Sequence, residues 1–185
     1  MGGDERYVFE VFQKSGAGVS FVLAKDETAP SFMATYGWSV NFGLPEFIVC
    51  GHKTMLPEWR RIHNELIIAT NAMPCIEDVQ DWPIEFKGHP LISVKVDQSN
   101  VTDDWFRDAL SYHRRAGMTE DLPAHQLFWA DREGNLPWDE GRFSVTLRWL
   151  QPPLYEPGIR PGDARPRKDD LRHGADVLLL SNPRT

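Results

Sequence analysis

The sequence has only two cysteines, Cys50 and Cys75, in 185 residues. Two cysteines cannot build the disulfide framework that stabilises many small secreted proteins. Cys50 ends the apolar run 47–50, where a free cysteine is typically a small buried hydrophobe. A nucleophilic role would require a base close to the thiol. Cysteine usage therefore favours a structural Cys50.

Long hydrophobic runs and an excess of basic residues are also missing. No stretch approaches the roughly 20 apolar residues of a membrane helix. Residues 1–5 contain no basic region that leads into an apolar run, as a secretion signal would. The 20 Lys and Arg are outnumbered by 27 Asp and Glu, which gives a net charge of −7. Because nucleic-acid binding needs a dense basic surface, we expect no nucleic-acid partner. Without a membrane helix or a secretion signal, we expect a cytoplasmic protein with no membrane partner.

The chain lacks the common catalytic and cofactor motifs. It has no Gly-x-Ser-x-Gly elbow and no phosphate loop, and residues 16–18 (Gly-Ala-Gly) do not continue into a dinucleotide fingerprint. None of the six histidines forms a close metal-binding pair, and no Cys-x-x-Cys is present. The sequence therefore predicts no cofactor and no metal. A site assembled in space from His63, His113 and His125 stays open, although structural roles for His63 and His113 beside apolar helix faces are favoured.

What the sequence does have is a large apolar content, with 41% hydrophobic residues, seven tryptophans and ten phenylalanines. Such a chain can bury a substantial core. Apolar residues at three- and four-residue spacing predict helices from Pro57 to about Asn71 and from Thr102, as N-cap, to Gly117. Alternating or continuous apolar runs predict strands over 7–12, 19–23, 31–37, 46–50, 84–86, 92–96, 127–130 and, most clearly, 143–149.

Strands and helices in this irregular order indicate an α+β fold, with a mainly antiparallel sheet and two principal helices packed on it. We expect one domain over residues 1–155. Residues 156–185 form a tail rich in proline, glycine and charge, flexible over 156–176 and apolar at 177–180. The apolar end can dock on the body, form a short strand or join neighbouring chains into a homo-oligomer.

Residues 126–139 (Gln-Leu-Phe-Trp-Ala-Asp-Arg-Glu-Gly-Asn-Leu-Pro-Trp-Asp) combine a strand, a turn and two tryptophans. Asp131 and Asp139 can cap the turn or act as a carboxylate pair, and turn chemistry alone accounts for these residue types. Trp129 and Trp138 can flank a ligand or cover the edge of the core. A calcium loop at 131–135 is disfavoured because the alternating ligands of an EF-hand are missing.

Together with residues 32–37 (Phe-Met-Ala-Thr-Tyr-Gly) and 42–51 (Phe-Gly-Leu-Pro-Glu-Phe-Ile-Val-Cys-Gly), this stretch resembles the bacterial family called domain of unknown function 4262. The similarity covers roughly residues 18–153. The family pattern has tyrosine before the threonine and valine after it, where this chain has Ala34 and Tyr36. The resemblance implies a small cytoplasmic bacterial protein and brings no established catalytic residues. The Thr-x-Gly strand before Pro-Glu is also faintly similar to suppressor-of-fused-like domains, which bind other proteins.

Two main functional hypotheses follow. The first is a binding module without catalysis that recognises a protein or small molecule through exposed aromatic residues. The second is a small hydrolase-like or tailoring enzyme that pairs Asp131 or Asp139 with a histidine such as His125. A structural or assembly subunit, joined through residues 177–180, is a third. The predicted ligand-binding residues are Thr35, Trp38, His125, Trp129, Asp131, Trp138 and Asp139.

Overall fold

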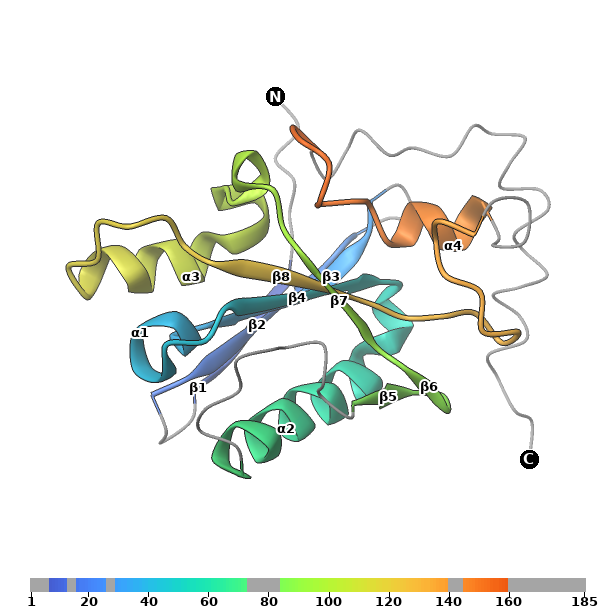
Figure 1. The fold of residues 1–185 in the computed structure, drawn as a ribbon, viewed down its shortest axis with the longest axis horizontal. Helices are drawn as coiled ribbons and strands as arrows, with labels where there is room; N and C mark the ends of the chain where they lie inside the picture. The colour runs from blue at the N-terminus through green and yellow to red at the C-terminus, as the bar shows by residue number, and fades with distance from the viewer. Residues whose placement is uncertain (1–6, 13–15, 26–28, 73–83, 140–144, 160–185) are drawn as a thin grey trace.

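The computed structural model describes residues 7–12, 16–25, 29–72, 84–139 and 145–159, and the following statements concern these residues. Eight strands and four α-helices alternate irregularly along the chain (Figure 1). The strands are β1 (Tyr7–Phe12), β2 (Gly18–Leu23), β3 (Ser31–Tyr36), β4 (Glu46–Gly51), β5 (Glu85–Phe86), β6 (His89–Pro90), β7 (Ile92–Lys95) and β8 (Ala124–Phe128). The helices are α1 (Trp38–Phe42), α2 (Leu56–Ala72), α3 (Asp103–Arg115) and α4 (Val145–Leu150), with short 3₁₀ turns η1 (Lys53–Met55) and η3 (Gln98–Asn100).

The main sheet has six strands in the order β1-β2-β3-β4-β8-β7. Strands β1 to β4 form an antiparallel meander, and β7 pairs antiparallel with β8. Strand β8 lies between β4 and β7 and runs parallel to β4, with Phe47 opposite His125. The α+β class is therefore confirmed, but the sheet is mixed rather than mainly antiparallel. The prediction missed the parallel pair because strand patterns do not reveal which distant strands become neighbours.

Two helices cover opposite faces of this sheet, with α3 above and α2 below it in Figure 1. Successive residues of a strand point to opposite faces, so each strand supplies both layers. Met33 and Val49 pack with Trp59, Ile62 and Leu66 on the α2 face. The α3 face contains residues from the alternate strand positions together with helix residues: Phe32, Ala34, Ile48, Cys50, Trp105, Phe106 and Ala109.

The two principal helices begin and end near their predicted limits. Helix α2 starts at Leu56, one residue before Pro57, and α3 follows Thr102. Gly117 has a φ of +75°, a conformation that glycine adopts readily after a helix. His63 and His113 are buried in α2 and α3, and Cys50 is a buried free thiol, as expected.

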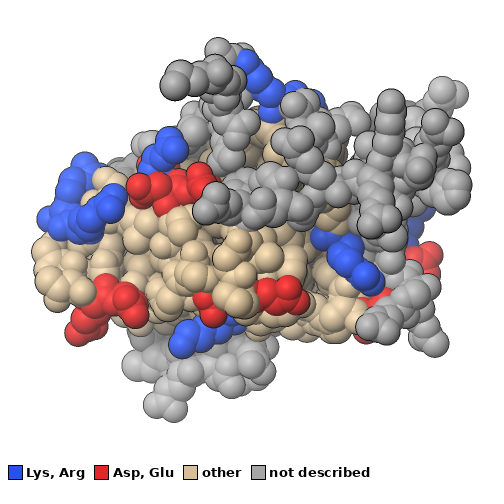
Figure 2. Space-filling model, turned by 90° about the horizontal axis from the view of Figure 1, so that it is seen from above, with Lys and Arg blue, Asp and Glu red and all other residues tan. Residues whose placement is uncertain are grey.

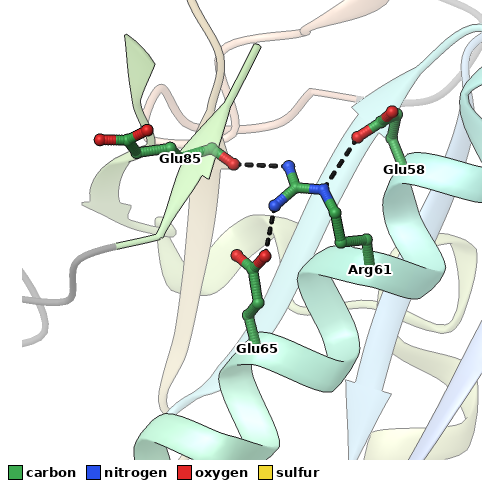
Figure 3. A network of polar contacts seen from close by, with 4 residues as sticks. All are labelled: Glu58, Arg61, Glu65 and Glu85. Atoms are coloured by element: carbon green, nitrogen blue, oxygen red, sulfur yellow. Dashed lines mark hydrogen bonds and ion pairs between the residues drawn. The ribbon is translucent and has the colours of Figure 1, made fainter. Parts of the chain in front are cut away.

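A charged network joins α2 to the small β5-β6 hairpin (Figure 3). The Arg61 guanidinium contacts Glu58 at 3.0 Å and also Glu65. Its third contact is a hydrogen bond of 2.6 Å to the backbone carbonyl of Glu85. Because both acidic partners are on α2 itself, the bond to Glu85 is the part of this network that reaches the hairpin, and the burial of Phe86 in the α2-face core adds to it.

The strand predicted over 143–149 is wrong. Residues 145–150 form helix α4, and residues 140–144 lie outside the described residues. Leu147 and Leu150 are spaced three apart, so the same apolar residues suit a short helix as well as a strand. Trp149 and Leu150 are buried in the α2-face core. Packing therefore overrides the alternating pattern. The strand predicted over 127–130 is β8, which begins three residues earlier.

The chain after α4 is held to the body through buried amide side chains. Gln126 bonds the carbonyl of Pro152 and the N–H of Leu154. Asn100, completely buried, bonds the carbonyl groups of Leu154 and Glu156 and the N–H of Ile159. Residues up to 159 are therefore anchored. Residues 160–185, with the apolar end at 177–180, lie outside the described residues, so the domain limits stay a prediction.

Candidate functional site

A pocket of about 200 Å³ lies between α3 and strands β2 and β3. Apolar side chains of the α3-face core form much of its lining, and hydroxyl and charged groups complete it. The lining residues are Ser20, Val22, Phe32, Ala34, Thr35, Asp103, Asp104, Trp105, Phe106, Arg107, Asp108 and Ala109.

The N-terminal part of α3 forms one wall of this pocket. Thr102, the N-cap, has extended backbone angles, and the carboxylates of Asp103 and Asp104 follow in the first turn, where they complement the helix dipole. Phe106 departs from helical geometry, with φ −127° and ψ 32°, so the helix is kinked beside the pocket. Trp105 packs on Phe32 with ring centroids 5.2 Å apart. These contacts fix the wall against the sheet.

A polar contact joins the two walls of the pocket. The hydroxyl of Ser20, on β2, donates a hydrogen bond to Oδ2 of Asp108, on α3. Asp104 and Asp108, on either side of the kink at Phe106, both line the pocket. Arg107 also lines the pocket, and Arg114 lies 3.7 Å from Asp103. Figure 2 shows the side of the molecule on which α3 lies. Basic atoms gather at the left, where α3 ends, with acidic atoms beside them.

A second polar centre surrounds Glu46, a carboxyl with no exposed surface. Its oxygens accept hydrogen bonds from the Thr35 hydroxyl (2.7 Å) and from the N–H and hydroxyl of Ser39 (3.1 and 3.2 Å). Burial raises the pKa of Glu46 above its usual value, and these hydrogen bonds oppose that change. Gly37, the N-cap residue of α1, has no side chain that could accept a hydrogen bond from the first turn of the helix. The Glu46 carboxylate accepts from the backbone N–H of Ser39 instead.

His125 forms a third polar contact, with a distance of 2.9 Å between its Nδ1 and Oγ of Ser93. Its ring also lies 6.5 Å from that of Phe47. Trp38 packs edge-on against Phe47 at 5.6 Å, and the backbone N–H of Phe47 donates to the Thr35 hydroxyl. Three predicted site residues, Thr35, Trp38 and His125, thus gather around Phe47.

The predicted residues of the 126–139 stretch lie in a different environment. The indole N–H of Trp129 donates to the carbonyl of Cys50, and its backbone is paired with the amide of Gln151. Asp131 accepts from the N–H groups of Glu133 and Asn135, and Asp139 accepts from that of Leu136. Both carboxylates therefore support the turn. Trp138 packs on Phe128 but is 40% exposed, whereas Trp38 and Trp129 are buried.

The histidines do not converge. His63 is on α2 and His113 on α3, which lie on opposite faces of the sheet. Among the described residues no group of three His, Cys, Asp or Glu side chains is placed to hold a metal. No helix within the described ranges is long and apolar enough to cross a membrane. Whether the predicted residues bind a ligand stays a prediction.

Sequence reasoning missed the pocket residues Ser20, Asp104 and Asp108. The available signal was the four-residue spacing of the two aspartates on a predicted helix. The partner on β2 could not be inferred, because the placement of α3 over β2 and β3 is a tertiary property.

Comparison with known protein families adds one finding to this geometry. The family model described as "Domain of unknown function (DUF4262)" matches residues 11–142. The chain belongs to this family. The DUF4262 region includes β2, β3, α3 and β8, and hence both the pocket and the Glu46 centre. No curated protein and no solved structure matches the chain.

Proposed function

We propose that this DUF4262 protein is a non-catalytic binding module that holds a small organic molecule in the pocket between α3 and strands β2 and β3. The observation that supports this function is the pocket itself, with apolar side chains and the Ser20–Asp108 contact on its walls. Small-molecule sites typically combine an apolar lining with a few placed polar groups. A volume of about 200 Å³ corresponds to roughly seven water molecules, so the ligand is compact.

The chemistry of the lining favours binding over catalysis. Its ionisable members are three aspartates and one arginine, all close to the start of α3. Asp131 and Asp139, which the enzyme hypothesis pairs with a histidine, accept hydrogen bonds from backbone N–H groups of their own loop. The net charge of −7 supports the absence of a nucleic-acid partner. The chain has too few cysteines for a disulfide framework, which supports a cytoplasmic location.

A fragment screen by protein-observed NMR tests this function. Binding fragments are expected to shift the backbone amides of residues 20–22, 34 and 103–109. The variant Val22→Phe fills the pocket from a half-buried position on β2 where an aromatic residue suits a strand, and it is expected to weaken binding at least about tenfold. The control Ile68→Phe, at a 67% exposed position on α2, leaves binding unchanged. A screen without pocket shifts, or equal binding by Val22→Phe, contradicts the proposal.

A second candidate function is a small hydrolase, favoured by the hydrogen bond between Ser93 and His125. A serine hydroxyl bonded to an imidazole is the arrangement that activates a nucleophile. In this case the protein would hydrolyse activated esters, and Ser93→Ala would remove that hydrolysis without unfolding the chain. Ester hydrolysis that equals the buffer rate, or that survives in Ser93→Ala, excludes this candidate.

A further inference from the structure

We infer that the ligand of this pocket is a small organic cation whose ammonium group binds at Asp108, an inference that rests on the proposed function. The pocket lining carries three carboxylates, on Asp103, Asp104 and Asp108, against one guanidinium, on Arg107. A second guanidinium, on Arg114, lies 3.7 Å from Asp103, so the carboxylates still outnumber the basic groups. An acidic lining raises the local concentration of cations and repels anions. The excess of carboxylates therefore favours a cation over an anion.

Asp108 differs from the other two aspartates in its position along α3. Asp103 and Asp104 occupy the first turn, where the helix dipole stabilises a negative charge and accounts for their presence. Asp108 lies in the middle of the helix, beyond the reach of that effect, and is only half-buried. Helix stability alone thus does not explain a carboxylate at this position.

The Ser20 hydroxyl holds the Asp108 carboxylate in a fixed orientation. It occupies Oδ2, while Oδ1 accepts no hydrogen bond from any of the residues that the structure describes. A carboxylate oxygen held in place on a pocket wall suits an ammonium group, because hydrogen bonds between two charged groups are short and strong. Ordering by Ser20 also reduces the entropy that the side chain would lose on binding.

The rest of the ligand is a short apolar chain. Val22, Phe32 and Ala34 belong to the pocket lining on the sheet side, opposite the acidic wall of α3. Burying methylene groups there contributes roughly 0.8 kcal/mol for each CH₂. The small volume limits the chain to a few carbons. The ligand class is accordingly a compact alkylammonium compound, with one charged end and one apolar end.

Three probes of nearly equal shape test the charge preference: n-pentylamine, n-pentanol and pentanoate. They are titrated into the full chain, and the pocket amides are followed by NMR. We expect pentylamine to bind at least about tenfold more tightly than pentanol, and pentanoate to bind most weakly, since hydrogen bonds between charged groups exceed neutral ones by this margin. The Asp108→Asn variant keeps the side-chain shape and removes the charge, so it should lose the preference for the amine. Asp121→Asn, the same charge change at an exposed loop position, should retain it.

The outcomes separate this inference from the proposed function. If pentanol or pentanoate binds the pocket as tightly as pentylamine, or if Asp108→Asn keeps the preference, the pocket binds ligands but the cation inference is wrong. If pentylamine shifts amides over the whole acidic surface and not those of the pocket, the inference is also wrong. If no probe and no fragment shifts the pocket amides, both the cation inference and the proposed function are wrong.

Discussion

The histidine buried in α2 gives this protein a specific sensitivity to acid. His63 is 3% exposed, and its Nε2 has no hydrogen-bond partner among the described residues. Burial lowers the pKa of His63 from 6.5 to about 4, because the charged imidazolium would lose its hydration there. The neutral form is therefore the one that the fold accommodates.

The direction of the effect follows from this lowered pKa. Well above pH 6.5, near pH 8, His63 is neutral in both the folded and the unfolded chain, and its contribution to stability does not change with pH. Below that pH the unfolded chain takes up a proton that the folded chain binds only near pH 4. The free energy of unfolding consequently falls by about 2 kcal/mol at pH 5 and about 3 kcal/mol at pH 4 relative to pH 8.

The variant His63→Leu isolates the contribution of His63 protonation to the free energy of unfolding, since leucine does not titrate, is apolar and favours helices. Urea unfolding of both proteins between pH 4 and 8, followed by circular dichroism, gives the difference in their unfolding free energies at each pH. Comparing the two proteins removes the contribution of Glu46, whose raised pKa has the opposite sign and whose stabilising effect disappears as the pH rises. We expect the difference to move by about 2 kcal/mol in favour of His63→Leu between pH 7 and pH 5. A difference that stays constant within about 0.5 kcal/mol over this range would refute the reasoning.

Two further predictions concern close packing and the anchored segment after α4. Gly18→Ala places a Cβ where the ring of Tyr36 lies, so it should lower the unfolding free energy by about 1–3 kcal/mol; unchanged stability in urea would mean that the ring moves freely. In the double variant Gly18→Ala, Tyr36→Ala, part of the stability lost through the steric overlap between the new Cβ and the ring should return, and a double-mutant cycle measures that part. Asn100→Ala removes the bonds to Leu154, Glu156 and Ile159 and should cost about 3 kcal/mol, with faster hydrogen exchange over residues 154–159. Exchange that is unaffected there would show that other contacts hold this segment. The same urea unfolding measurement is made on the Val22→Phe and Asp108→Asn proteins of the binding experiments, which are expected to keep their fold.

Much of this fold could be predicted because local patterns decide local structure. Apolar spacing located α2 and α3, and runs of β-forming or continuous apolar residues located the first four strands. The 143–149 segment shows the limit: Val145, Leu147 and Trp149 alternate like a strand, yet the structure forms α4, because packing against the core outweighs a pattern of a few residues. The parallel contact between β4 and β8 could not be predicted, since it joins residues about 80 positions apart.

The candidate site divides in the same way. The roles of Asp131 and Asp139 in their turn follow from turn chemistry, which is a local property. The grouping of Thr35, Trp38 and His125 around Phe47 brings together residues chosen for separate reasons. The Ser20–Asp108 contact crosses from β2 to α3, and no pattern in either segment specifies the other.

The place of β8 in the sheet has a consequence for synthesis of the chain. Strands β1 to β4 are complete once residue 51 has been made, but the partner of β4 on its other edge is not translated until residues 124–128. During that interval a strand whose six residues are all buried in the finished protein exposes an unpaired edge. Such edges are templates for aggregation, and distant parallel pairing is slow to form. The ribosome-bound chain therefore passes through a stage at which β4 is open to incorrect partners, and insertion of β8 ends it.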